Sequence, residues 1–294
     1  CGKKNTNGHS VTCSSLTARS SATTCTLCED NHFECCAFSC GDIDGSGMDY
    51  SCPASAVRFL KQDVLCIGSA CTEAECCLFS PADKATLKAA VDACIAETPD
   101  ASCPDYSAIN GAIGDWDVSK ITDMQELFKE AADFNVDLSK WQVSKVTTMY
   151  RMFYSTNNPC SLVDPNIGGW DVSRVTNMGY MFYNCQYLNG DLSNWNVESV
   201  VTMNDIFGGC SKFNSDISAW QTLSLENIAG AFFVAWDFNS DLSKWTMSKV
   251  TTLKSTFYWA RSFNSDISKW DISNVNNMNA VFAGGATSFN ADIS

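Results

Sequence analysis

Histidine, proline and basic residues are scarce in this chain of 294 residues. Its two histidines, His9 and His32, are too few to build a set of zinc sites from cysteine and histidine. Lysine and arginine together number 19 against 33 aspartates and glutamates, so the net charge at pH 7 is −14. Nucleic acid is a polyanion that binds basic surfaces, and we therefore expect no nucleic-acid partner.

Membrane spans, N-glycosylation sites and catalytic motifs are also missing from the sequence. No run of 18 apolar residues occurs, so we expect no transmembrane segment. No Asn-x-Ser/Thr sequon occurs, which excludes N-glycosylation. We find no nucleophile placed beside a base and no glycine-rich phosphate loop. We therefore expect no catalytic residues, no cofactor and no enzyme activity.

Cysteine, by contrast, is abundant and unevenly placed. Fourteen of the 17 cysteines lie in residues 1–103, a density that implies disulfides and an extracellular or cell-surface location. The stretches CTLCEDNHFECC (25–36) and CIGSACTEAECC (66–77) end alike. Residues 1–79 are therefore predicted to form a disulfide-rich region of two small modules. Its disulfide candidates in the second stretch are Cys66, Cys71, Cys76 and Cys77.

The cysteine-rich region also contains a short acidic loop, DIDGSGMD, with Asp42, Asp44 and Asp49. The loop resembles the first half of an EF-hand, but its twelfth position is Pro53, where a glutamate would be needed. We interpret it as a tight turn between cysteines, with a calcium-binding loop as the alternative.

Cysteines outside the modules predict further disulfides. Cys94 and Cys103 are close in sequence and flank a turn, so we expect them to pair. Cys185 and Cys210 share one position in adjacent repeats, where stacking would bring their Cα atoms within the disulfide range of about 4.4–6.8 Å. Cys160 lies in a four-residue insertion and competes for the same partner.

A tryptophan recurs every 25 residues through the C-terminal two-thirds of the chain, with one interval of 29. A fixed period of this length is typical of a solenoid whose stacked units share one core. Burying one such large side chain stabilises the fold by about 1.5–3 kcal/mol, so we interpret this column as structural. Its members are Trp116, Trp141, Trp170, Trp195, Trp220, Trp245 and Trp270.

The apolar spacing within one unit predicts two kinds of secondary structure. Trp170 and Val172 alternate as in a short strand. Val175, Met178 and Phe182 then follow at gaps of three and four, the spacing of a short helix. The expected fold of residues 104–294 is thus an α/β solenoid of leucine-rich-repeat-like coils with short parallel strands, comprising seven repeats and a partial eighth. Residues 80–103 are predicted to form a helical N-terminal cap, with Ser80 and Pro81 at the helix start.

Two polar columns close each unit. The asparagines are expected to satisfy backbone groups at the bend of each coil. The aspartates two residues later are expected to cap local N–H groups, with bound calcium along the column as the alternative. The asparagines are Asn135, Asn189, Asn214, Asn239, Asn264 and Asn290, and the aspartates are Asp137, Asp191, Asp216, Asp241, Asp266 and Asp292.

The repeated blocks, such as WDVSRVTNMGYMF followed by FN-x-D-(I/L)-S, resemble the BspA-type surface-protein repeat, a variant of the leucine-rich repeat. The resemblance covers residues 80–294 and implies cell-surface adhesion, with no catalytic residues. The ending of the second cysteine stretch loosely resembles cysteine-rich repeats of secreted algal and protist proteins. A processed bacterial lipoprotein with an acylated Cys1 is the less favoured alternative.

These features predict an extracellular structural or adhesive protein whose partners are further copies of itself or other surface proteins. The sequence stops in mid-repeat, so we expect head-to-tail assembly into a surface filament, with Cys1 as a candidate for an intermolecular bond. The alternative is a carbohydrate-binding or receptor-type recognition module. Aromatic residues outside the core positions would form its partner or glycan surface. These are Tyr154, Tyr183, Tyr187, Phe233, Trp236, Tyr258 and Trp259.

Overall fold

The computed structural model describes residues 58–60, 77–285 and 287–290. The chain divides into two compact units, one of residues 1–80 and 108–111 and one of residues 81–107 and 112–294. In the first unit, strand β1 (Arg58–Leu60) pairs antiparallel with β2 (Cys77–Phe79). The predictions for Cys1, for calcium at Asp42, Asp44 and Asp49, and for Cys66, Cys71 and Cys76 lie outside the described residues, as does most of the two-module region.

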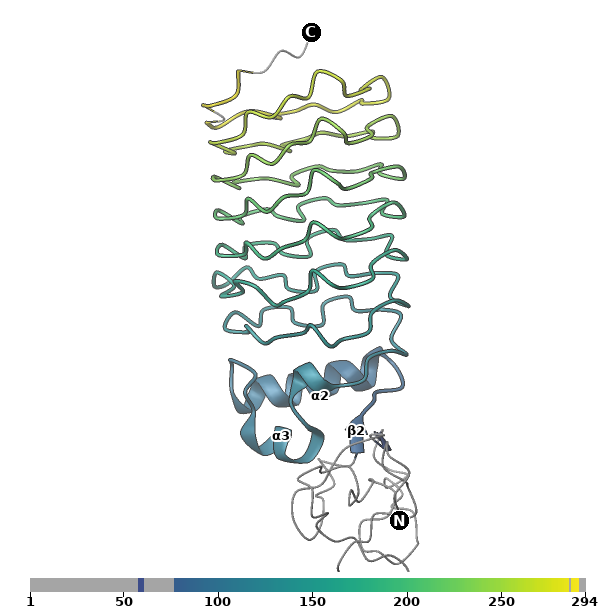
Figure 1. Ribbon diagram of the computed structural model, residues 1–294. Helices are drawn as coiled ribbons and strands as arrows, with labels where there is room; N and C mark the ends of the chain where they lie inside the picture. Colours follow the sequence, from purple (N-terminus) through teal and green to yellow (C-terminus); the bar gives the residue numbers. More distant parts are fainter. Residues whose placement is uncertain (1–57, 61–76, 286, 291–294) are drawn as a thin grey trace, which may run out of the picture. The chain divides into compact units, whose positions relative to one another are not determined.

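The second unit begins with helix α2 (Lys84–Glu97), which lies across the first coil (Figure 1). The predicted helix start at Ser80 is wrong. Asp83 is the N-cap, because its carboxylate accepts the Thr86 N–H at 2.8 Å. Leu87, Ala90, Val91 and Cys94 form the buried side of the helix. Helix α3 (Pro104–Asn110) and the 3₁₀ turn η2 (Ile113–Asp115) follow. No helix in the described residues is long and apolar enough to cross a membrane.

From residue 113 onward the chain winds into stacked coils that contain neither regular strands nor α-helices in the described residues (Figure 1). The prediction of an α/β solenoid with parallel strands is therefore wrong. Adjacent coils are joined by single parallel bridges, which do not extend into a sheet. The bridges link Asp123 to Thr148, Thr148 to Asn177, Asn177 to Thr202, Thr202 to Asn227, Asn227 to Thr252 and Thr252 to Asn277.

The expected helix is replaced by successive tight turns. The Leu127 N–H donates to the Met124 carbonyl, and the Ala131 N–H to that of Phe128, so apolar residues fall at gaps of three and four without a helix. The N–H groups between these turns donate instead to the next coil. The backbone at the tenth position after each tryptophan has a positive φ, which interrupts any right-handed helix. These residues are Glu126, Arg151, Tyr180, Asp205, Gly230, Ser255 and Ala280.

The tryptophan column lies in the core, where each of the seven indoles is at most 8% exposed. Six of the indole N–H groups donate to the carbonyl of an aliphatic residue in the preceding coil, as Trp195 does to Ile167 at 3.0 Å. Trp195 and Trp220 stack with ring centroids 6.1 Å apart and planes 7° from parallel. A parallel column of phenylalanines stacks beside them, as Phe232 does on Phe257. Each coil thus depends on its neighbours for both packing and hydrogen bonds.

Candidate functional site: an aromatic face with two arginines

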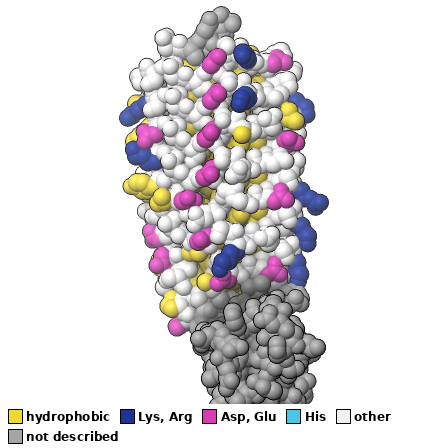
Figure 2. Space-filling model, viewed as in Figure 1, with side chains coloured by type: hydrophobic (Ala, Val, Ile, Leu, Met, Phe, Trp, Pro, Cys, Tyr) yellow, Lys and Arg dark blue, Asp and Glu magenta, His cyan; other side chains and the backbone are white. Residues whose placement is uncertain are grey.

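The acidic column is built from capped turns. The Oδ1 atoms of five aspartates each accept the N–H of the serine two residues later at 2.8–2.9 Å. These hydrogen bonds lower the pKa of Asp137, Asp191, Asp216 and Asp241. Figure 2 shows acidic side chains in a line along the coils. Nowhere in the described ranges do three potential metal ligands gather, and Asp292 lies outside these ranges.

The asparagine column forms a ladder between coils. The Oδ1 atom of each asparagine accepts the backbone N–H of the next asparagine along the column at 2.7–2.8 Å, from Asn189 through Asn290. Asn135 instead accepts the Val163 N–H at 3.2 Å, because the insertion displaces the next coil. The asparagine amides are therefore committed to holding the coils together.

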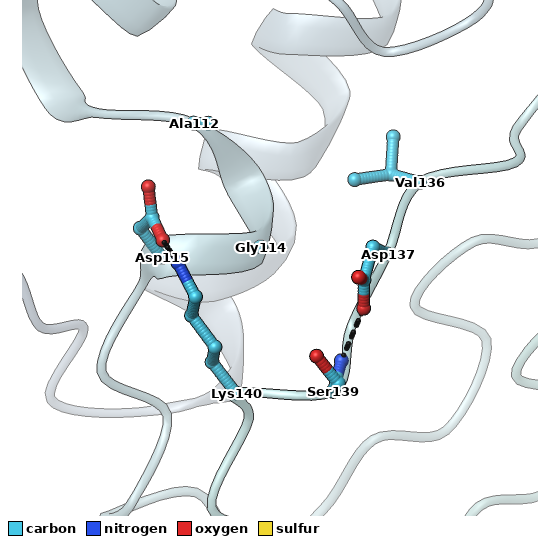
Figure 3. Close-up of a pocket in the computed structure, with 7 residues that line it drawn as sticks. All are labelled: Ala112, Gly114, Asp115, Val136, Asp137, Ser139 and Lys140. Atoms are coloured by element: carbon cyan, nitrogen blue, oxygen red, sulfur yellow. Dashed lines mark hydrogen bonds and ion pairs between the residues drawn. The ribbon is translucent and has the colours of Figure 1, made fainter. Parts of the chain in front are cut away.

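A shallow hollow of about 230 Å³ lies between the first two coils (Figure 3). Its charged groups are already paired. Lys140 contacts Asp115 at 2.6 Å, and Asp137 accepts the Ser139 N–H. The Asp137 carboxylate also bonds the Ser139 side chain, so the charged and polar groups of the hollow serve the contact between the two coils.

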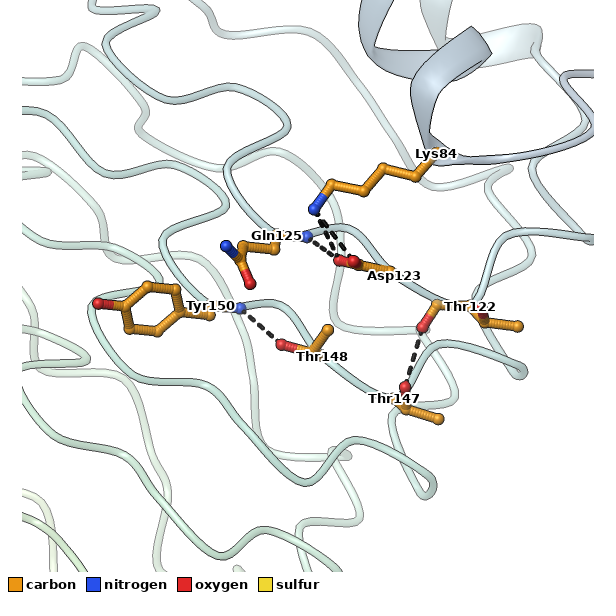
Figure 4. A network of polar contacts seen from close by, with 7 residues as sticks. All are labelled: Lys84, Thr122, Asp123, Gln125, Thr147, Thr148 and Tyr150. Carbon is orange, nitrogen blue, oxygen red and sulfur yellow. Dashed lines mark hydrogen bonds and ion pairs between the residues drawn. The ribbon is translucent and has the colours of Figure 1, made fainter.

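The polar network beside helix α2 joins that helix to the first coil (Figure 4). Lys84 contacts both carboxylate oxygens of Asp123 at 3.0–3.1 Å, and the same carboxylate accepts the Gln125 N–H. Asp123 occupies the bridge position at which the later coils have threonine or asparagine. In the first coil, the neutral residue of that position is replaced by a carboxylate that binds Lys84 of helix α2. The network is thus part of the cap.

The cysteines of the second unit form two disulfides, between Cys94 and Cys103 and between Cys160 and Cys185. The competition for Cys185 is resolved in favour of Cys160, with Cα atoms 4.4 Å apart. Cys210 keeps a free, buried thiol that donates to the Phe182 carbonyl at 3.0 Å. Burial raises the pKa of this thiol. The side chain of Cys77 is not among those described.

The aromatic residues outside the core lie where the turn segments face solvent, and we call this surface the aromatic face. Its members at the thirteenth position after each tryptophan stack in pairs along the coils. The Tyr154 and Tyr183 rings are 5.3 Å apart, and those of Phe233 and Tyr258 are 5.2 Å apart. Gly208 occupies the position between the two pairs, and its backbone lies against the Tyr183 ring.

One half of the aromatic face, the tyrosine cluster, consists of Tyr150, Tyr154, Tyr180 and Tyr183 around Arg151. The guanidinium lies 4.9–5.2 Å from the ring centroids of Tyr150, Tyr154 and Tyr180. Burial, followed by the charge of Asp205, raises the pKa of Tyr180 and Tyr183. This cluster is therefore partly desolvated and internally packed.

A carboxylate lies beside the tyrosine cluster. Burial raises the pKa of Asp205, while hydrogen bonds from Tyr180 and Asn204 act in the opposite direction. The next coil leaves room for this carboxylate only because it has Gly230 there. A Cβ at that position would collide with the carboxylate, and the backbone φ is +64°.

The other half, the tryptophan cluster, consists of Trp236, Trp259 and Arg261. The Arg261 guanidinium lies 4.6 Å from the Trp236 ring centroid and 5.0 Å from that of Trp259. The indoles are 38% and 36% exposed, unlike those of the core. Tyr187 is 55% exposed and takes part in none of the ring contacts of the described residues, so it stands apart from both clusters.

Sequence reasoning identified the aromatic residues of this face except Tyr150 and Tyr180, and it missed both arginines. The sequence did contain a sign of each arginine contact, namely a shared position after the core tryptophan. Trp236 and Arg261 each follow a core tryptophan by 16 residues, so stacking brings them together. Arg151 and Tyr180 likewise each follow a core tryptophan by ten residues, so stacking brings them together as well.

A protein-family model described as "Mycoplasma protein of unknown function, DUF285" matches residues 103–160, 156–260 and 227–294. These matches together cover the coils and more than half of the chain. No curated protein and no solved structure matches the chain.

Proposed function

The chain belongs to the DUF285 family, and because the function of that family is unknown, we propose a function from the surface of the coils. The protein is an extracellular adhesive repeat protein that holds its partner on the aromatic face. The observation that carries this proposal is the exposure of Trp236 and Trp259, at 38% and 36%, on a fold that buries its other seven tryptophans. Exposed aromatic clusters on a soluble surface are typical of binding sites.

The disulfides support an extracellular location. Two are present in the second unit, and 14 of the 17 cysteines fall in residues 1–103. Disulfides persist in oxidising compartments and are rare in the cytosol. The resemblance of the repeated blocks to BspA-type surface proteins favours the same location and an adhesive role.

The shape of the coils supports binding of an extended partner. Tyr154, Tyr183, Phe233 and Tyr258 occupy the same turn position in four coils, and the tryptophan cluster follows at the next positions of the turn, so a polymer lying along the coils would contact them in turn. Repeat proteins commonly bind through such extended surfaces. In the hollow between the first coils and in the acidic column, the charged side chains already bind partners within the protein. Neither surface therefore offers a comparable set of side chains to a ligand.

The proposal is tested by screening the full chain on an array of glycans and surface proteins, beside a variant with both Trp236→Ala and Trp259→Ala. We expect the wild type to bind and the variant to lose that binding. Leu223→Ala is the matched control, because it removes an exposed apolar side chain that is not part of the aromatic face and should bind like wild type. Unchanged binding by the double variant, or binding by no array member, would refute the proposal.

A further inference from the structure

The two arginines of the aromatic face differ in how their charge is balanced. Arg151 lies among three tyrosines and 3.5 Å from the carboxylate of Glu126, so its charge has a partner within the protein. Arg261 lies between two indoles, and none of the ion pairs among the described residues includes it. Arg151 therefore serves the packing of the tyrosine cluster, whereas Arg261 keeps an unbalanced charge.

The carboxylate nearest to this cluster in sequence is already occupied. Asp237 directly follows Trp236, and it pairs with Lys212 at 3.0 Å. Lys212 lies one coil earlier in the stack, whereas Arg261 lies one coil later. In a chain whose net charge is −14, this exposed arginine has no acidic partner among the residues that the structure describes. A local positive charge on such a surface favours an anionic group from outside.

The stacking of Arg261 leaves its hydrogen-bonding groups available. A guanidinium that stacks on an aromatic ring uses its flat face, while its N–H donors point outward in its plane. The side chain donates none of the hydrogen bonds found among the described residues. Two parallel N–H groups match the two oxygens of a carboxylate or of a sulfate. The cluster therefore presents a donor pair between two apolar indole surfaces.

The indoles are held in place by the next coil and by the arginine. Trp259 packs against Gly284 and Gly285, and a Cβ at Gly284 would collide with its indole nitrogen. Gly284 also has a φ of +76°, which favours glycine. A ring fixed in this way offers apolar surface at little conformational cost. The C–H groups of a sugar ring are the apolar surface that such an indole can contact while the sugar hydroxyls stay in water.

We propose that Trp236, Arg261 and Trp259 form a binding site for an anionic sugar residue of an extended polysaccharide. The carboxylate or sulfate of the sugar accepts from the Arg261 guanidinium, and its ring packs on the exposed indoles. This inference rests on the proposed adhesive function of the aromatic face and names the ligand class for its tryptophan cluster. The tyrosine cluster, with its arginine neutralised, contributes no second anionic site.

The test titrates the full chain with an oligogalacturonate, a sulfated galacto-oligosaccharide, a neutral galacto-oligosaccharide and an acidic peptide, using isothermal calorimetry. The first two separate a carboxylate ligand from a sulfate ligand. The variant Arg261→Gln should weaken binding of the preferred anionic probe by roughly ten- to hundredfold, because it removes a charge-assisted pair of hydrogen bonds. Arg174→Gln is the matched control, since Arg174 is exposed and lies over no aromatic ring of the described residues.

Three other outcomes would overturn the inference, and each points to a different cause. If all three sugars bind alike and Arg261→Gln has no effect while Trp236→Ala abolishes binding, the ligand is not selected by charge and the adhesive function stands. If an acidic peptide binds at this cluster and the sugars do not, the partner is a protein and the sugar assignment is wrong. If no probe binds and the array screen is also negative, the inference and the proposed function fail together.

Discussion

Replacement of Trp195 by alanine should remove a large part of the stability of the coils. Trp195 is 3% exposed and packs against Phe182 and Trp220, with ring centroids 6.3 and 6.1 Å away. Truncation of a buried tryptophan costs about 3–5 kcal/mol. The Ile167 carbonyl would lose one of its two donors but would keep the Trp170 N–H at 3.0 Å, so we expect a loss of about 3–5 kcal/mol.

The assay is equilibrium unfolding in guanidinium under non-reducing conditions, followed by circular dichroism and by fluorescence. Trp195→Phe separates the two contributions, because it keeps an aromatic ring but removes the N–H donor, and it should cost about 1–3 kcal/mol. Trp236→Ala is the exposed control and should cost at most about 1 kcal/mol. A loss below about 1 kcal/mol for Trp195→Ala would show that the column does not hold the coils together.

Hydrogen bonds depress the pKa of Asp137, Asp191, Asp216 and Asp241 below the unfolded value of 3.8, so their stabilisation is complete above that value and is lost as the pH falls through the folded pKa values. The thermal midpoint should therefore fall below about pH 4, and a flat profile from pH 5 to 2 would contradict this. The Cys210 thiol should resist a thiol reagent at pH 8 until the chain unfolds, because it is buried and its pKa is raised; rapid labelling of folded protein would be inconsistent with the coil packing. Asn239→Ala should cost about 0.5–1.5 kcal/mol in urea unfolding, since Asn264 loses its acceptor, whereas no change would mean that water replaces the ladder fully. Head-to-tail assembly stays a prediction, and a single monomeric species in sedimentation at micromolar concentration would count against it.

The tryptophan and asparagine columns could be predicted from the sequence because they depend only on the period. Residues 25 positions apart come together in any stacked coil, whatever backbone joins them. The backbone itself could not be predicted in this way. Met178 and Phe182 fit a helix and a chain of tight turns equally well. The turns depend on positive φ at Tyr180 and Asn184, and a bulky tyrosine gives no sign of such a conformation.

For the cysteines, too, the period predicts which residues come together, but not which of them form a bond. Cys160 follows Trp141 by 19 residues, and removing the four-residue insertion places it at the position of Cys185 and Cys210. All three therefore belong to one column, and the central member can pair with only one neighbour. The sequence identified the candidates, but the choice depends on how the insertion folds. Likewise, the sequence predicted the aromatic face, because its residues lie outside the repeated core positions. The unbalanced charge of Arg261 could not be predicted, because it depends on which ion pairs form around this residue.

We propose that the tryptophan cluster binds a ligand, whereas the tryptophan column only holds the fold together. The most direct test is the spectrum of the nine indole N–H groups in ¹⁵N-labelled protein, recorded with and without an oligogalacturonate. We predict that only the Trp236 and Trp259 signals shift, and that the indole N–H groups bound to carbonyls stay unchanged and exchange slowly with deuterium. Shifts spread over the core indoles, or none at Trp236 and Trp259 with any anionic or neutral sugar, would contradict the account.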